Sequence, residues 1–90
     1  MRFRMLMDEV TSVLQNRIRE LREDNDLAQK YIASYLCVAQ NTYSNYESGN
    51  REIPIAQLIR LADYYNVNLD YLLGRTDVRE PLPRSKRPFL

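Results

Sequence analysis

The sequence predicts an all-α domain of five helices with a short extension at each end. Only two glycines and seven tyrosines occur among 90 residues, a composition that favours helices over a turn-rich sheet. Apolar residues also recur at spacings of three and four along most of the chain, the period of a helix with one buried face. The length is that of one small domain.

The first predicted helix runs from about Thr11 to Asn25. Its apolar face comprises Val13 or Leu14, Ile18 and Leu21, and its arginines are expected on a solvated face. Residues 1–10 form an N-terminal extension, either a short extra helix or a disordered arm.

The stretch from Gln29 to Tyr46 contains two short helical patterns with a sharp break at Cys37-Val38. The predicted helices span about 28–36 and 39–47. Their facing apolar positions are Ile32, Ala33, Leu36, Tyr43 and Tyr46. Cys37 is expected to be a small buried residue of the turn.

The outer face of the second of these helices keeps four short polar side chains, namely Gln40, Asn41, Ser44 and Asn45. An amide offers one acceptor and two donors, which suits the edge of a base in the major groove. The stretch therefore predicts a helix-turn-helix whose second helix reads DNA.

The remaining chain predicts a loop, two more helices and a tail. Gly49 suits a left-handed helix end and Pro54 a helix start. The fourth helix draws its apolar face from Leu58, Ile59, Leu61 and Ala62, and the fifth runs over 69–73 and ends at Gly74. From Thr76 the chain becomes basic and holds Pro81, Pro83 and Pro88, which predicts a flexible tail.

An ordered set of residues over about 16–77 resembles the Cro/CI-type (Xre-family) DNA-binding domain, which has a lambda-repressor-like fold. The set comprises Leu27-Ala28-Gln29, Ile32-Ala33, Val38, Gln40, Thr42, Ser44, Tyr46-Glu47, Gly49, Pro54, the run from Leu58 to Val67 and the run from Leu69 to Gly74. Similar proteins usually carry Thr, Gly and Ser at the positions of Ala28, Cys37 and Ala39. Two helix caps are thereby lost, and Asp26 is a candidate replacement for the first.

The resemblance implies a sequence-specific transcriptional regulator, a repressor that binds a palindromic operator in double-stranded DNA as a homodimer through its last helix. Phosphate contacts are expected from Gln29, Lys30, Thr42, Asn50 and Arg51. Arg17 is the arginine of the first helix most expected near the DNA backbone, whereas Tyr46 and Glu47 are expected to be structural. The DNA-binding domain is assigned to residues 11–77 and the basic tail to 78–90.

Composition limits other functions. No apolar run approaches the roughly 20 residues of a membrane span, and no signal peptide is convincing. One cysteine and no histidine leave no zinc site, no cofactor motif is present, and no nucleophile–base pair indicates an enzyme. A cytoplasmic location is expected. The net charge is only +1, with −2 over residues 14–77 and +3 in the tail, so non-specific DNA affinity is expected to be modest.

Two alternatives remain at this stage. One is an antitoxin that binds DNA through the same domain and a partner protein through 1–10 or 79–90. The other is a helix-turn-helix domain kept only for protein–protein contact, which the acidic balance of 14–77 favours.

Overall fold

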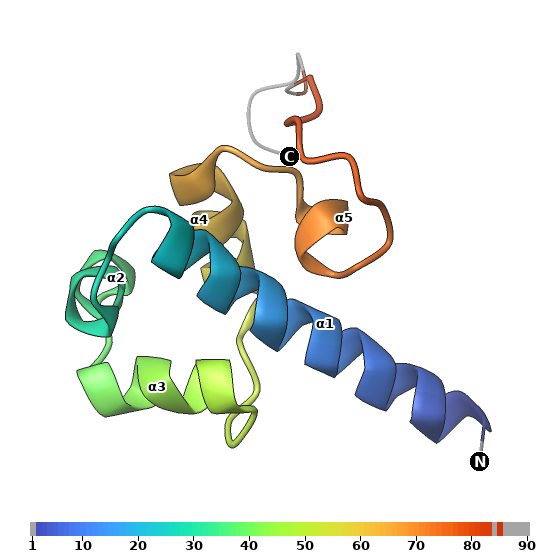
Figure 1. Ribbon diagram of the computed structural model, residues 1–90, viewed down its shortest axis with the longest axis horizontal. Coiled ribbons are helices and arrows are strands. Elements are labelled where there is room, and N and C mark those ends of the chain that lie inside the picture. Colours follow the sequence, from blue (N-terminus) through green and yellow to red (C-terminus); the bar gives the residue numbers. More distant parts are fainter. Residues whose placement is uncertain (1, 84, 86–90) are drawn as a thin grey trace.

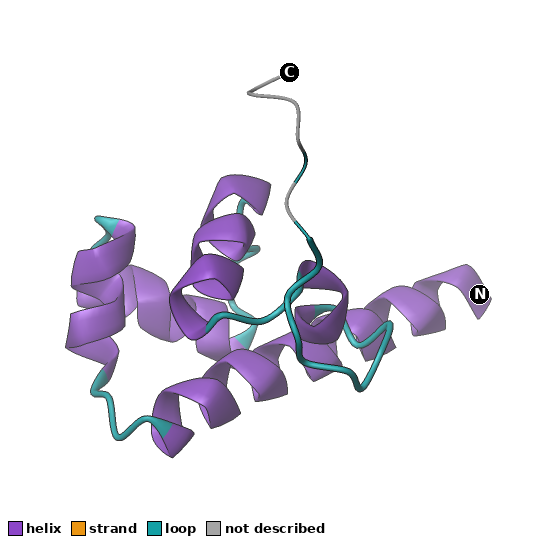
Figure 2. Ribbon diagram, turned by 90° about the horizontal axis from the view of Figure 1, so that it is seen from above, coloured by secondary structure: helices purple, strands orange, loops and turns teal. Residues whose placement is uncertain are grey.

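The chain folds into five helices, α1 (Arg2–Asp24), α2 (Gln29–Leu36), α3 (Gln40–Ser48), α4 (Ile55–Tyr65) and α5 (Leu69–Leu72) (Figure 1). The computed structural model describes residues 2–83 and 85, with only the helical backbone for residues 2–11. No strand occurs in this described part, as Figure 2 shows. The all-α, five-helix prediction is confirmed, and none of the described helices has the length and apolarity to cross a membrane.

α1 packs chiefly on α3 and α5, and the core lies between the five helices. Its fully buried side chains come from every helix: Ile18, Ile32, Leu36, Tyr43, Leu61 and Leu72. Leu14 packs against this cluster from the side, so the predicted apolar face of α1 is confirmed. The prediction for Ile59 is wrong, because this side chain is 49% exposed on α4 and Leu58 takes the inward place.

α1 begins at Arg2 rather than near Thr11. The expected break after the N-terminal extension was wrong because residues 2–24 contain neither glycine nor proline, so nothing in the backbone stops the helix. At the other end, Asp26 adopts a left-handed backbone with φ of 54° and closes α1. It does not cap α2, because the N-cap position is taken by Ala28, which has no side-chain hydrogen bond to offer.

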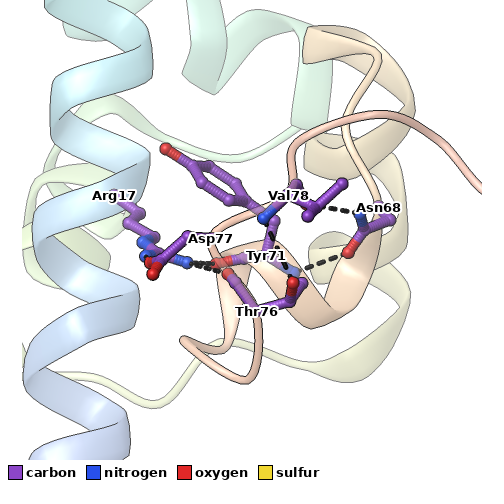
Figure 3. A network of polar contacts seen from close by, with 6 residues as sticks. All are labelled: Arg17, Asn68, Tyr71, Thr76, Asp77 and Val78. Atoms are coloured by element: carbon purple, nitrogen blue, oxygen red, sulfur yellow. Dashed lines mark hydrogen bonds and ion pairs between the residues drawn. The ribbon is translucent and has the colours of Figure 1, made fainter.

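The segment that follows α5 is bound to the body rather than free. Asn68 donates from Nδ2 to the carbonyl oxygens of Val78 and Glu80, each at 2.8 Å. The backbone amide of Asn68 donates to the carbonyl oxygen of Arg79 at 3.1 Å. The side-chain Oδ1 of Asn68 accepts from the backbone amide of Tyr71 (Figure 3). The prediction of a flexible tail from Thr76 onward is therefore wrong up to Glu80. Residues 84 and 86–90 lie outside the described residues.

Arg17 holds the same segment from the side of α1. Its guanidinium donates to the carbonyl oxygens of Tyr71 and Thr76 and forms an ion pair with Asp77 at 2.8 Å (Figure 3). It also lies 4.1 Å from the centre of the Tyr71 ring. Arg17 is thus committed to α5 and the segment after it, which corrects the expectation that it contacts the DNA backbone.

Candidate nucleic-acid interface

α2 and α3 meet at a tight left-handed corner. Cys37 has φ of 59°, and the amides of Cys37 and Val38 donate to the carbonyl oxygens of Ser34 and Ala33 at the end of α2. Ala33 is 2% exposed, and its small side chain lets the two helices approach. The break predicted at Cys37-Val38 is confirmed, but the prediction of a buried Cys37 is wrong, because its thiol is exposed.

The inner face of α3 is held in the core by two tyrosines. Tyr43 and Tyr46 are almost fully buried, with ring centres 6.3 Å apart in an edge-to-face arrangement. The expectation that Tyr46 belongs to the core is confirmed. This anchoring fixes the rotation of α3 and therefore decides which of its side chains face outward.

Of the four predicted base-reading side chains, Asn41, Ser44 and Asn45 lie on the opposite face of α3, and Gln40 is the first residue of the helix. Gln40 and Asn41 are exposed, and Ser44 and Asn45 are half-buried. Within the part of the chain that the structure describes, none of these four side chains forms a hydrogen bond. Their donors and acceptors are therefore available to an external partner.

Glu47 locks the C-terminal end of α3 to α1 and α2. Arg22 donates from Nε to Oε2 of Glu47 at 2.6 Å and from Nη2 to Oε1 of Glu47 at 3.0 Å, which makes a bidentate ion pair. The side chain of Glu47 is 5% exposed. The Arg22 guanidinium also donates to the carbonyl of Leu27 at 2.8 Å, and Gln29 donates to Oε1 of Glu47 at 3.2 Å. The structural role expected for Glu47 is confirmed. The solvated role expected for Arg22 is wrong.

The electrostatics of this cluster favour a charged Glu47. Burial opposes its ionisation, but hydrogen bonds to the carboxylate from Arg22 and neighbouring groups outweigh burial and lower the pKa of Glu47. Burial first, and the nearby carboxylate second, raise the pKa of Tyr43. The Tyr43 hydroxyl lies close enough to Glu47 for the carboxylate to raise its pKa. The hydroxyl nevertheless has no well-oriented hydrogen-bond partner among the described residues. The phenol therefore stays neutral while the carboxylate carries the charge.

The predicted phosphate-binding residues fall into two groups. Gln29 is half-buried and already bonded to Glu47. Lys30, Asn50 and Arg51 are exposed, and Thr42 is half-buried at the start of α3. Lys30 and Arg51 have no ion pair within the described residues, whereas Arg17, Arg22 and Arg75 each pair with a carboxylate. Lys30 and Arg51 are therefore the cations of α2 and the loop after α3 left for an anionic partner.

The loop after α3 presents its basic residue from a closed helix end. Gly49 takes the left-handed conformation, with φ of 84°, and the amide of Arg51 donates back to the carbonyl of Asn45 at 3.2 Å. In contrast, the N-cap residues of α2 and α3 are Ala28 and Ala39, and neither provides a side-chain cap. Uncapped helix starts leave their first amides to water or to a ligand.

An anchored helix with an outward row of unpaired amides, set by a tight corner against a second helix, defines a helix-turn-helix DNA-binding domain. The sequence profile of the helix-turn-helix family matches residues 18–72. The chain belongs to the Cro/CI-type (Xre) helix-turn-helix family of transcriptional regulators. The prediction that it is not an enzyme is confirmed by this membership.

Several curated proteins similar to this chain are named as transcriptional regulators. The chain is 35% identical over 74 residues to the uncharacterized HTH-type transcriptional regulator YobD of Bacillus subtilis, covering 82% of this chain and 64% of that protein. It is 36% identical over 70 residues to the HTH-type transcriptional regulator AnsR of B. subtilis, covering 78% and 60%. It is 32% identical over 77 residues to the cryptic phage CTXphi transcriptional repressor RstR of Vibrio cholerae, covering 83% and 69%.

The chain thus spans less than two thirds of the length of the first two relatives. No solved structure matches it significantly.

Proposed function

We propose that this chain is a sequence-specific transcriptional repressor that binds a palindromic operator in double-stranded DNA as a homodimer. The observation that supports it most is the outward face of α3, where four side chains remain without internal partners on a helix fixed by Tyr43, Tyr46 and Glu47. A rigid helix that presents amides is suited to the major groove. A dimer bound at a promoter would then block transcription.

In this proposal, Gln40, Asn41, Ser44 and Asn45 contact base edges. An amide paired with adenine through two hydrogen bonds contributes about 1–3 kcal/mol of discrimination. Phosphate contacts come from Lys30, Thr42, Asn50 and Arg51, and Gln29 joins them with the part of its amide that Glu47 does not use. Phosphate contacts fix the register of the protein on DNA but carry no sequence information directly.

Selection of bound duplexes from a random DNA pool tests the proposal directly. We expect enrichment of a site with two-fold symmetry and half-sites about one helical turn apart. A pool without any enriched sequence at low salt would contradict DNA recognition and favour the protein–protein alternative.

Alanine substitutions separate reading from phosphate contact. Gln40→Ala and Asn41→Ala are expected to weaken operator binding while non-specific binding changes little, because their amides gain only from the right base. Arg51→Ala is expected to weaken operator and random duplexes alike and to flatten the salt dependence by about one unit of log–log slope.

Two matched variants control this experiment. Arg75→Ala removes one exposed positive charge from the other end of the fold, where Arg75 pairs with Asp70, and is expected to leave the slope nearly unchanged. Ser34→Ala removes an exposed polar group from α2. If Arg51→Ala relaxes sequence preference while the amide variants weaken all duplexes equally, the assigned roles are reversed.

A further inference from the structure

Gln57 is a polar residue on the buried face of α4. It is 9% exposed, and the other buried residues of this helix are the apolar Leu61 and Ala62. A buried amide without hydrogen bonds is unfavourable, because it has given up its bonds to water. The position of Gln57 therefore requires partners for both ends of its amide.

Both ends of this amide have a partner. The Nε2 of Gln57 donates to the carbonyl oxygen of Leu36 at 3.0 Å, in a hydrogen bond that is itself buried. The Oε1 of Gln57 accepts from Nη1 of Arg60 at 3.1 Å. A carbonyl oxygen only accepts and a guanidinium only donates, so these two neighbours allow a single orientation of the amide.

The bond to Leu36 joins α4 to the corner between α2 and α3. Leu36 is the last residue of α2, so its carbonyl oxygen has no donor within that helix. The two amides of the corner donate to earlier carbonyl oxygens of α2 instead. Among the described residues, the donor that reaches the Leu36 carbonyl is the side chain of Gln57, 21 positions further along the chain.

This corner carries the first turn of α3. The N-cap residue Ala39 contributes no side-chain hydrogen bond, so the turn that holds Gln40 and Asn41 depends on residues 37–38 for its place. The other end of α3 is held separately, by the ion pair of Glu47 described above. A displaced corner would therefore move the first turn more than the last.

Base contacts require more exact placement than phosphate contacts. An amide that pairs with adenine uses two hydrogen bonds at once, and each weakens steeply when its angle departs from linear. The long, exposed side chains of Lys30 and Arg51 can follow a phosphate through a small shift of the backbone. A displaced corner should thus weaken recognition of sequence more than binding to DNA in general.

We infer that Gln57 is a positioning residue for sequence recognition, because its bond to Leu36 fixes the corner and with it the first turn of α3. Gln57 is buried and does not contact DNA itself. This inference rests on the proposed function, since it concerns how the same reading helix is held in place.

Two variants that remove the donor test this role. Gln57→Met keeps the length of the side chain without its polar atoms, and Gln57→Glu keeps the shape and an acceptor for Arg60. Each is expected to weaken binding to the selected operator about tenfold and binding to a scrambled duplex less than about twofold, as if one base-reading amide were displaced. Affinities are measured where circular dichroism shows that the variant is folded.

Two further variants serve as controls. Arg60→Met retains the bond between Gln57 and Leu36 and should keep the wild-type ratio of operator to scrambled affinity. Leu72→Val weakens the core at α5, which packs on α1 and α4, and should also keep this ratio while the protein is folded. Equal losses for both duplexes in the two Gln57 variants, or no loss at all, would overturn the inference.

Amide hydrogen exchange without DNA gives a readout that does not depend on the proposed function. Gln57→Met should speed exchange of the Cys37 and Val38 amides about tenfold beyond the effect of Leu72→Val, with no such excess at Tyr46. Unchanged exchange at the corner would overturn the inference whatever the duplexes show. A wild-type chain that prefers no sequence would overturn the proposed function and the role of Gln57 in recognition, while exchange would still show whether Gln57 holds the corner.

Discussion

Two arginines of α1, five positions apart, join this helix to opposite halves of the molecule. Arg22 binds Glu47 and fixes the end of the reading helix α3, whereas Arg17 binds α5 and the segment after it. The arginine side chains are similarly buried, at 14% and 16% exposure. Their carboxylate partners differ sharply, with Glu47 at 5% and Asp77 at 99%. Because the two N–O distances are similar, we expect the burial of the carboxylate to decide what each ion pair contributes to stability.

The half that contains Arg22 depends on a charge pair removed from water, and breaking such a pair leaves one charge buried alone. The half that contains Arg17 depends mainly on carbonyl oxygens that accept from a guanidinium, with an exposed carboxylate as a minor addition. The variants below test this difference, from the largest expected effect to the smallest.

Arg22→Ala is expected to lower the free energy of unfolding by about 3–5 kcal/mol, because it leaves Glu47 buried without its cation. Urea denaturation followed by circular dichroism measures the change. The double variant Arg22→Met/Glu47→Leu replaces both charges by apolar groups and should recover most of the loss. A loss below about 1 kcal/mol for Arg22→Ala would mean that water reaches Glu47 and that the two halves do not differ as described.

Acid tests the same pair without changing the sequence of the chain. The folded protein lowers the pKa of Glu47, so the stability from this group is present above the unfolded-state pKa, about 4.3, and is lost as pH falls through the folded pKa. The loss should be smaller than for Arg22→Ala, because protonation also removes the buried charge.

Urea denaturation at pH 7, 5, 4 and 3 measures this dependence. Glu47→Gln should be less sensitive to acid than wild type, while Glu20→Gln, at an exposed position of α1, should behave as wild type. Equal acid sensitivity of wild type and Glu47→Gln would contradict a charged Glu47 that stabilises the fold.

Arg17→Ala is expected to cost about 2 kcal/mol, because the carbonyl oxygens of Tyr71 and Thr76 lose a charged donor. Asp77→Asn is the matched test of the exposed partner and should produce no measurable change. Thermal unfolding of both variants gives the comparison. If Asp77→Asn destabilises as much as Arg17→Ala, the ion pair rather than the carbonyl contacts holds the segment after α5.

Cys37→Gly is expected to stabilise by about 1 kcal/mol, since the left-handed backbone at φ of 59° strains a residue with a Cβ. The thiol is exposed and makes a weak contact with the carbonyl oxygen of Tyr35 at 4.0 Å, so we expect its removal to cost little. Asn66→Gly, at φ of 55°, should increase stability less than Cys37→Gly, because Asn tolerates the left-handed conformation better than Cys does. A melting temperature that falls in Cys37→Gly would show that the side chain contributes more than the strain it causes.

Local patterns predicted much of this molecule. The corner at Cys37-Val38, the core face of Ile32, Ala33 and Leu36, and the left-handed end at Gly49 follow from residues close in sequence, and the structure confirms each. The outward position of Asn41 follows from the inward position of Tyr43 and Tyr46, because the helical period fixes the two faces together. Gln40 is exposed because it is the first residue of α3.

Contacts between distant residues were not predictable in the same way. Arg22 and Glu47 are 25 positions apart, and Arg17 and Asp77 are 60 apart, so no local spacing reveals either pair. A signal was present for the first, since a carboxylate on the buried face of α3 requires a cation nearby. The sequence carries no sign that residues 76–80 bind Asn68, because Asn68 donates to backbone carbonyl oxygens, which every residue has.

The missing caps at Ala28 and Ala39 have a consequence for how the domain opens locally. The last turn of α3 is closed by Gly49 and the amide of Arg51, while its first turn has no side chain to hold its amides. Local opening of α3 therefore requires least free energy at its first turn, and amide hydrogens there should exchange with solvent faster than those near Tyr46. Gln40 and Asn41 belong to that turn. Two of the side chains proposed to contact base edges thus belong to the least protected part of a helix whose other end is held by Gly49 and Arg51.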